Sequence, residues 1–408
     1  MRTQATIEEI ARDSYGRLLA YLASRTGGFC AAEDALGDAL LEGLRKWPEA
    51  GVPENPCGWL LAVAKRRLID ASRHEAIRRR EEDKVVLLIE EVQTAELPDD
   101  RLKLLFVCAH PAIDIAARTP LMLQTILGLD GGRIASAFLS SPAAMHQRLV
   151  RAKSRIRAAG IPFRIPEPAE WPERVGFVLD AIYTAYSTGW DCAAEGGDCQ
   201  LAGEAVFLAR LLVRDLPSEP EGRGLLALML HCEARRAARF SPDGAFVPLQ
   251  KQDPALWDAA MINEAEFHLA EAVRSGRSGR YQLEAAIQSV HAARRHAPEI
   301  NWRMIIGFYD ALIVATDGIG AAIGRAAALA EAGEPPAALD ALDRIPVQRV
   351  ANHQPYWATR GHVLERCGRS TEALEAWQRS IGLTETPALR EYLGTRATAC
   401  RRPHQERD

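Results

Sequence analysis

A cation-rich stretch near the middle of the chain is the first feature whose residue types could do chemistry. Residues 131–160 read GGRIASAFLSSPAAMHQRLVRAKSRIRAAG and hold six Lys or Arg residues with no Asp or Glu, although the whole chain has a formal net charge of −4. Cations spaced along a helix neutralise phosphates, which is the electrostatic requirement for binding nucleic acid. A merely solvated basic helix has the same composition, so charge alone leaves both interpretations open.

The elements that must position these cations are predicted to form a helix-turn-helix. Ser141-Pro142 is an N-cap followed by a first-turn proline, and it separates a short helix at 131–139 from a longer one at 142–157. One face of the longer helix is apolar at helical spacing, with Met145, Leu149, Ala152 and Ile156. From its other faces we expect DNA contacts by His146, Gln147, Arg148, Arg151 and Lys153.

A second candidate surface is acidic and belongs to a helix expected over 31–46. Its carboxylates recur every fourth residue and therefore lie along one face, at Asp34, Asp38 and Glu42. The expected inward stripe of the same helix is Ala35, Leu36, Ala39, Leu40 and Leu44. Taken alone, the carboxylates fit a solvated face as well as they fit a surface that binds a basic partner.

A third helix follows the loop WPEAGVPENPCG, which three prolines stiffen. Asn55-Pro56 supplies the N-cap and the first-turn proline of this helix, which runs to Arg73 or as far as Arg80. Its second half is strongly basic. A stiff loop followed by cations is suited to holding an unstacked single strand, because pockets and phosphate contacts matter there more than groove reading.

The overall composition limits the class of protein. A chain of 408 residues is too long for one hydrophobic core, and 48% apolar with 25% charged residues is typical of soluble globular proteins. Aromatic residues make up only 6%, which favours helices over sheets. The start has no signal-peptide pattern and no apolar run reaches membrane length, so we expect a cytoplasmic protein with no membrane partner.

Enzymatic and metal-dependent functions are not expected from the sequence. The eight Cys include no C-x-x-C pair, and His110, His231 and His291 have no carboxylate or Cys at ligand spacing. We interpret the histidines as core residues and the cysteines as free thiols. Since the C-terminal half also has no Gly-rich phosphate loop, no nucleophile elbow and no paired-carboxylate or metal constellation, we expect no enzyme activity, no metal and no cofactor.

The composition changes after a proline-rich stretch at 161–173, which predicts a hinge. Two segments beyond it, GEPPAALDAL and GRSTEALEAW, stand 35 residues apart in equivalent places. The matching residues are Gly333 with Gly368, Ala338 with Ala373 and Leu339 with Leu374. This offset is close to the 34-residue tetratricopeptide period, in which pairs of helices stack into a solenoid.

Three stretches of the first 160 residues resemble a group-four, extracytoplasmic-function sigma factor of bacterial RNA polymerase. AAEDALGDALLEGLRKW resembles the region 2 helix that grips the β′ coiled coil, and the cation-rich stretch resembles the region 4 helix-turn-helix that reads the −35 element. ENPCGWLLAVAKRRLIDASRH resembles the following region 2 helix, N-P-x-x-W-L-x-x-I-A-x-N-x-x-x-D-x-x-R. The residues that match it in register are Asn55, Pro56, Trp59, Leu60, Ala64, Asp70 and Arg73.

The resemblance implies partners and site residues. Core RNA polymerase would be bound at its β′ coiled coil by Asp34, Asp38 and Glu42, and region 4 would meet the β flap. The promoter −10 element would be held by Trp47, Asn55, Lys65, Arg66 and Arg73. The −35 element would be read by the five DNA contacts of the 142–157 helix. Of the usual Gly-Thr-Val-Lys-Ser-Arg in that helix only Arg148 is present, so the −35 sequence preference is not carried over.

Some of these factors have a tetratricopeptide-like extension, and the stretches LPDDRLKLLFVCAHPAID, RTPLMLQTILGLD, LLALMLHCEARRAAR and YQLEAAIQSVHA are similar to that group. The resemblance implies an all-α chain with region 2 at 1–80, a linker at 81–96, region 4 at 97–160, the hinge at 161–173, a helical-repeat regulatory domain at 174–400 and a tail at 401–408. A further hypothesis is that the repeat domain contacts the sigma domains and regulates them in cis. The alternative is a helix-turn-helix regulator that acts without polymerase and whose repeat domain binds an effector or a peptide.

Overall fold

The computed structural model describes residues 7, 14–26, 28–76, 98–138, 140–192, 200–297, 299–316 and 318–401. Within these ranges the regular elements are all helices, apart from one isolated bridge between Phe240 and Phe246. The predicted all-α fold is therefore confirmed. The predicted linker at 81–96, the extension of the third helix to Arg80 and the tail beyond residue 401 lie outside the described residues. No helix in the described part of the chain is long and apolar enough to cross a membrane.

The chain divides into two compact units, Met1–Ala185 and Tyr186–Asp408. The division falls inside a helix, α10 (Val175–Cys192), and not in the proline-rich stretch at 161–173 that the sequence suggested as a hinge. That stretch is held by contacts within the first unit. The carboxylate of Glu170 forms ion pairs with the guanidinium groups of Arg164, at 3.1 Å, and of Arg174, at 2.8 Å. The indole N–H of Trp171 donates to the carbonyl of Pro166 at 3.0 Å.

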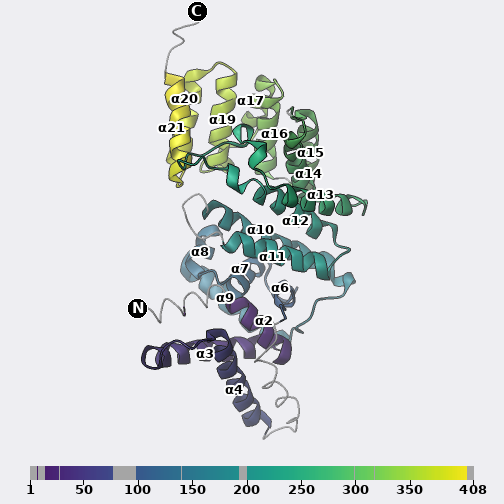
Figure 1. Ribbon diagram of the computed structural model, residues 1–408, viewed down its shortest axis with the longest axis vertical. Coiled ribbons are helices and arrows are strands. Elements are labelled where there is room, and N and C mark those ends of the chain that lie inside the picture. Colours follow the sequence, from purple (N-terminus) through teal and green to yellow (C-terminus); the bar gives the residue numbers. More distant parts are fainter. Residues whose placement is uncertain are drawn as a thin grey trace, which may run out of the picture. The chain divides into compact units, whose positions relative to one another are not determined.

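The first unit is built around the helix α2 (Figure 1). Its elements are α2 (Tyr15–Thr26), α3 (Phe29–Ala50), α4 (Pro56–Ala76), α6 (Arg101–Cys108), α7 (Ile115–Leu127), α8 (Gly131–Ala137), α9 (Pro142–Ala159), η2 (Pro168–Glu173) and the first part of α10. Leu18, Leu19 and Leu22 of α2 are fully buried, and α2 contacts α3, α4, α6 and α7. The predicted region 2 and region 4 segments therefore share one core and are not separate domains in this structure.

The helix-turn-helix expected from the sequence is present as α8 and α9. The hydroxyl of Ser141 accepts a hydrogen bond from the backbone N–H of Ala144 at 3.3 Å, and Pro142 occupies the first turn, as predicted. The helix ends at Gly160, whose φ of 57° lies in the left-handed region that glycine adopts without strain. All four residues of the predicted inward stripe, Met145, Leu149, Ala152 and Ile156, are buried.

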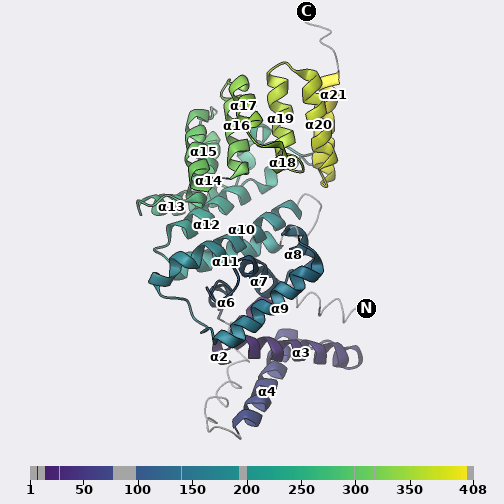
Figure 2. The ribbon, with the colours of Figure 1, turned by 180° about the vertical axis from the view of Figure 1, so that it is seen from behind.

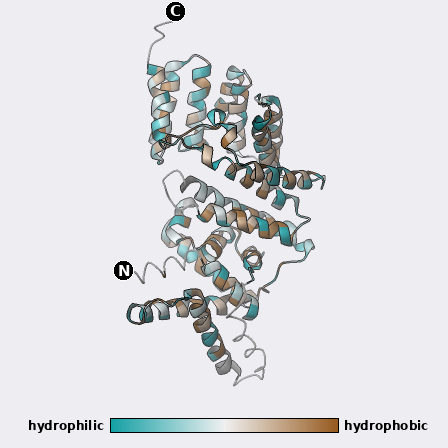
Figure 3. Ribbon diagram, in the orientation of Figure 1, coloured by the Kyte–Doolittle hydropathy of each residue, from teal (hydrophilic) through white to brown (hydrophobic). Residues whose placement is uncertain are grey.

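The second unit is a succession of packed helices in chain order (Figures 1 and 2). After the end of α10 its elements are α11 (Gln200–Asp215), α12 (Pro220–Glu233), η4 (Arg236–Ala238), η5 (Leu249–Lys251), η6 (Pro254–Leu256), α13 (Ala259–Val273), α14 (Arg280–Ala292), η7 (Ala293–Arg295), α15 (Trp302–Thr316), α16 (Ile319–Glu331), α17 (Pro335–Asp343), α18 (Val347–Val350), α19 (Gln354–Arg366), α20 (Ser370–Gly382) and α21 (Pro387–Arg401). Polar and apolar residues alternate along these helices, as expected for amphipathic elements that share a core (Figure 3).

The 35-residue repeat corresponds to two helical hairpins, α16–α17 and α19–α20. Gly333 and Gly368 stand at the two hairpin turns with φ values of 88° and 73°, a conformation that side chains disfavour. The alanines that follow them, Ala338 and Ala373, are both fully buried in one hydrophobic core. The predicted internal repeat is thus a structural repeat of helical hairpins in this part of the chain.

Candidate nucleic-acid interface

The outer face of α9 presents most of the predicted DNA contacts to solvent. His146, Gln147 and Arg151 are exposed, and Arg148 is half-buried. Arg148 and Arg151 form no ion pair with any residue that the structure describes. Their charge is therefore available to an external anion. A Gln side chain between such cations can donate to and accept from a base edge, which is the arrangement that groove reading requires.

The opposite flank of α9 is not free, because it pairs with the acidic helix α3. The ammonium of Lys153 lies 2.5 Å from a carboxylate oxygen of Glu33, and the guanidinium of Arg157 lies 2.8 Å from one of Asp34. The thiol of Cys30 lies beside them, 3.7 Å from the carbonyl oxygen of Lys153. A predicted −35 contact and a predicted polymerase contact thus belong to a single cluster in this structure.

The remaining acidic residues of α3 differ from one another. Asp38 is exposed and has no ion pair among the described residues, whereas Glu42 pairs with Lys46 at 2.7 Å and with Arg67 at 3.2 Å. The hydrogen bond from Lys46, followed by the charges of Lys46 and Arg67, lowers the pKa of Glu42. Of the predicted trio, Asp38 is therefore the carboxylate that is ready for a partner.

Apolar side chains accompany Asp38 on the outer face of α3. Leu41 is 53% exposed and Leu44 is 41% exposed, so Leu44 does not belong to the inward stripe in which the sequence placed it. The stripe turns away from Leu44 because Trp47, one turn later, fills the core position and packs over Gly43. Exposed leucines beside a carboxylate form a surface suited to an amphipathic, basic partner helix.

Two of the five predicted −10 contacts are buried. Trp47 is only 2% exposed and meets Trp59 edge-on with ring centroids 5.3 Å apart, so it packs in the core and presents no face for a base. Lys65 is also buried, and its ammonium lies 3.4 Å from the Tyr21 hydroxyl and 5.3 Å from the centre of that ring. These placements correct the expectation that both side chains lie on the surface.

The other predicted −10 contacts lie on or beside α4. Asn55 is exposed, and its side-chain oxygen accepts from the backbone N–H of Gly58 at 2.9 Å, which confirms its predicted capping role. Arg66 is exposed one turn from Asp70. Arg73 lies within α4, and its side chain is not among those that the structure describes.

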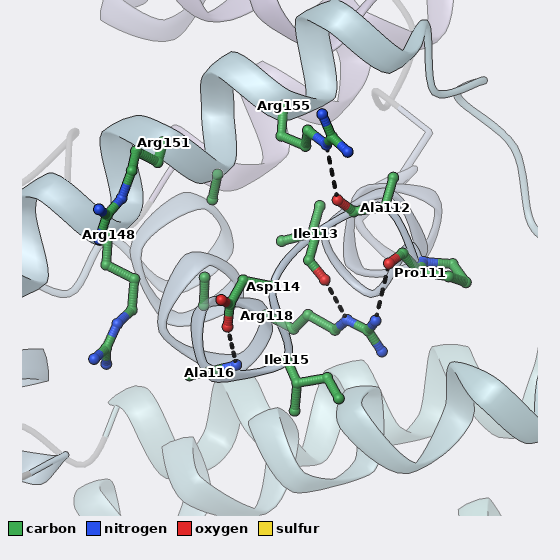
Figure 4. Close-up of a pocket in the computed structure, with 12 residues that line it drawn as sticks. Pro111, Ala112, Ile113, Asp114, Ile115, Ala116, Arg118, Arg148, Arg151 and Arg155 are labelled. Carbon is green, nitrogen blue, oxygen red and sulfur yellow. Dashed lines mark hydrogen bonds between the residues drawn. The ribbon is translucent and has the colours of Figure 1, made fainter.

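A cavity of about 910 Å³ lies beside the free flank of α9 (Figure 4). Its walls are the loop 111–114, the first turn of α7 and the α9 residues Arg148, Arg151, Ala152 and Arg155. The guanidinium of Arg118, on α7, donates hydrogen bonds to the carbonyls of Ile113 and Pro111 at 3.1 and 3.3 Å. Sequence reasoning did not select Arg155, although its spacing from Arg148 and Arg151 puts all three on one side of the helix.

The histidines that the sequence singled out do not form a chemical site. Burial, with a smaller effect of the Arg235 charge, lowers the pKa of His231 to about 3 and that of His291 to about 4, so both are neutral at physiological pH. Neither nitrogen of His231 forms a hydrogen bond with the described residues, although its Nε2 lies 3.5 Å from a carboxylate oxygen of Glu266; the Nδ1 of His110 accepts from the backbone N–H of Ala112. Among the described residues no group of three or more His, Cys, Asp or Glu is placed to hold a metal ion.

The described residues form an all-helical protein with two compact units, the first containing the α8–α9 helix pair and the second containing the repeated helical hairpins. A family model described as a family of unknown function (DUF6596) matches residues 174–273. An uncharacterized protein of Rhizobium meliloti (strain 1021) is 36% identical over 373 residues, which cover 89% of this chain and 88% of that protein. The chain belongs to the same family as this rhizobial protein. Among solved structures, yeast Tom70 has a TM-score of 0.35 and 12% identity over 91% of this chain and 80% of its own.

Proposed function

We propose that this chain is a sigma factor, a subunit that binds core RNA polymerase and directs it to promoter DNA. The observation that carries the proposal is the presence, in one compact unit, of an exposed acidic-apolar face on α3 and an exposed cationic face on α9. A promoter-specificity subunit needs both surfaces, one for a protein and one for nucleic acid. A regulator that acts without polymerase needs only the second.

The α3 face is the proposed polymerase contact. Asp38 supplies a charge without a partner in the described chain, and Leu41 and Leu44 supply apolar area that the fold leaves in solvent. An apolar centre with a charge beside it is the composition of a specific protein interface. The α4 residues Asn55, Arg66 and Arg73 are the proposed −10 contacts, while Trp47 and Lys65 support that helix from the core.

The α9 face is the proposed −35 contact. Gln147 would read a base edge, and Arg148 and Arg151 would meet phosphates on the free flank. Lys153 can join them only if it leaves Glu33, and Asp34 can meet polymerase only if it leaves Arg157. In the free chain the two proposed surfaces are therefore joined by these two ion pairs. We propose that polymerase binding separates α3 from α9.

The helical-repeat unit is proposed to regulate the sigma unit in cis, because both are parts of one chain. A truncation that tests this should end after Cys192, since α10 begins in one unit and ends in the other and a cut at 174 would remove it. If the truncated chain matched the full chain in core binding and in promoter-directed transcription, the cis-regulatory part of the proposal would fail while the sigma assignment stood.

The first prediction concerns core binding. Asp38→Arg is expected to weaken binding of the full chain to bacterial core RNA polymerase by about tenfold or more, because a cation replaces the free carboxylate on the α3 face. Fluorescence anisotropy of labelled chain titrated with core enzyme measures the affinity. Asp340→Arg, which makes the same charge change at an exposed position of α17, is the matched control and should bind like the wild type.

Equal binding by both variants and the wild type would show that the α3 face is not the polymerase contact. Absence of any core binding, together with specific binding to DNA by the wild type, would instead favour the regulator that acts without polymerase.

The second prediction separates positioning from base reading on α9. Arg151→Gln is expected to weaken binding to all duplexes alike and to reduce the salt slope by about one, because one phosphate contact is lost. Gln147→Ala is expected to change the order of preference among duplexes with a smaller effect on mean affinity. Arg344→Gln in the second unit controls for the loss of a positive charge. If Gln147→Ala weakened binding to all duplexes alike, as expected for Arg151→Gln, the assignment of Gln147 to a base edge would be wrong.

A further inference from the structure

We propose that the cavity between α7 and α9 binds a phosphate group carried on an organic body. The cavity lies entirely within the first unit, and its 910 Å³ are within the usual range for sites that take a small molecule. The sequence did not identify this cavity, because Arg148 and Arg151 are the only lining residues among the five expected DNA contacts, and the wall formed by residues 111–118 was not recognised.

The charge of the cavity is strongly unbalanced. Arg118, Arg148, Arg151 and Arg155 line it, and the lining has a single carboxylate, Asp114. One oxygen of Asp114 already accepts from the backbone N–H of Ala116 at 2.8 Å, as the N-cap of α7. None of the four arginines forms an ion pair within the described chain, and a guanidinium is always charged.

The contrast with the other flank of the same helix shows that this imbalance is local. Lys153 and Arg157 are each matched by a carboxylate of α3, whereas the three arginines of the cavity flank are matched by none. Like charges held together raise the free energy of the folded state unless a counter-charge joins them. A phosphate is the counter-charge for which guanidinium groups are best shaped, since each can donate two parallel hydrogen bonds to it.

The walls are held in place by two of the arginines themselves. Arg118 donates to the carbonyls of Ile113 and Pro111 and stacks 4.6 Å from the ring centre of Phe177, and Arg155 donates to the carbonyl of Ala112 at 3.3 Å (Figure 4). Both therefore fix the loop 111–114 against the helices, which pre-forms the cavity. Arg148 and Arg151 are left to approach the ligand.

The floor of the cavity is apolar, with Ile113, Ala117 and Ala152. A cationic rim over an apolar floor fits a ligand that joins phosphate to a less polar body, such as a sugar and a base. Two sources carry this chemistry, the backbone of a DNA duplex and a free nucleotide. The first source deepens the proposed function and rests on it, because Arg148 and Arg151 also belong to the proposed −35 face. The second is independent of it.

The test uses the full chain and three probes, namely pyrophosphate, ADP and a 30-base-pair duplex, each titrated at fixed ionic strength. The variant is Arg148→Gln with Arg151→Gln, the two arginines that the walls leave for the ligand, and Arg344→Gln is the control for charge. We expect the double variant to lose about tenfold in affinity for pyrophosphate and the control to lose none. Thermal unfolding of the double variant should match that of the wild type, since neither Arg148 nor Arg151 forms an ion pair or a hydrogen bond with the described residues.

The remaining probes identify the source of the phosphate. Binding of ADP that the double variant weakens identifies a free nucleotide. If the double variant weakens binding of the duplex but not of ADP, and pyrophosphate competes with the duplex, the source is the DNA backbone. If neither pyrophosphate nor the duplex responds to the double variant, the inference is overturned. Failure of core binding leaves a positive pyrophosphate result intact, so loss of the proposed function and loss of this site are distinguishable.

Discussion

Replacing Gly16 with alanine is expected to lower the stability of the first unit by about 3 kcal/mol, the largest effect that a single methyl group should have in this unit. A Cβ at Gly16 would lie 2.2 Å from the carbonyl oxygen of Ile126 and 2.8 Å from its carbonyl carbon and Cα. All three are backbone atoms of α7, and backbone cannot rotate aside as a side chain can. The helices α2 and α7 must therefore move apart, and with them the two segments that the proposal assigns to polymerase and promoter.

Hydrogen exchange read by mass spectrometry measures this effect locally. Amides of α2 and α7 should exchange roughly a hundredfold faster in Gly16→Ala, since each 1.4 kcal/mol is a factor of ten in the opening equilibrium. Peptides of α19 and α20 should be unchanged. The matched control is Gly37→Ala in α3, where a Cβ would meet no atom within 4 Å and where alanine should stabilise the helix by about 1 kcal/mol.

The same substitution tests the proposed function from another direction. If polymerase must separate the parts of the first unit, loosening α2 from α7 should strengthen core binding by the Gly16→Ala chain. Unchanged exchange in α2 and α7 would mean that the two helices are not packed as closely as described. Faster exchange with weaker core binding would mean that polymerase recognises the closed unit, contrary to the proposal.

The local features of the interface could be predicted because they depend on neighbouring residues. The N-caps at Ser141 and Asn55 follow from a side-chain oxygen three residues before a backbone N–H of the first helical turn, and the inward stripe of α9 follows from helical spacing. The hairpin turns at Gly333 and Gly368 follow in the same way, because a repeat of glycine marks a repeated left-handed turn.

The features that could not be predicted depend on residues far apart in the chain. Lys153 and Glu33 are separated by 120 positions, and no pattern in either helix indicates that the other is its partner. Trp47 at the end of a helix and Lys65 within a basic run looked like surface residues. Burial of Trp47 requires Trp59 beside it, and burial of Lys65 requires the ring and hydroxyl of Tyr21. Charge and aromaticity alone do not determine whether a residue is buried, because burial depends on its neighbours in the folded chain.

The ion pairs between α3 and α9 lead to the second large prediction, which concerns the pair Lys153–Glu33. Its side chains are 28% and 17% exposed, against 65% and 70% for Arg157–Asp34, so the inner pair is better shielded from water and salt. We expect Lys153→Glu to weaken the free energy of the contact between α3 and α9 by about 2 kcal/mol, because a charged hydrogen bond is replaced by repulsion between two carboxylates. Arg157→Gln should cost much less, because solvent and salt screen an exposed pair.

A double-mutant cycle isolates the interaction from other effects of the substitutions. Glu33→Lys combined with Lys153→Glu restores opposite charges at the same two positions, so the double variant should recover most of the protection that each single variant loses in hydrogen exchange at α3 and α9. Additive losses, with no recovery, would show that the two side chains do not interact in solution. High salt should reduce the coupling only modestly, because the pair is partly buried.

Core binding by Lys153→Glu then decides whether the contact matters for function. This substitution leaves α3 intact and acts on the helix that holds it, so we attribute the expected change in polymerase affinity to the freedom of α3. We expect affinity to rise severalfold, since polymerase no longer has to break the inner pair before it separates α3 from α9. A Lys153→Glu chain with an open α3–α9 contact and unchanged core affinity would mean that polymerase binding does not require the two helices to separate. Asp38, Leu41 and Leu44 would then be sufficient as a contact surface in the closed unit.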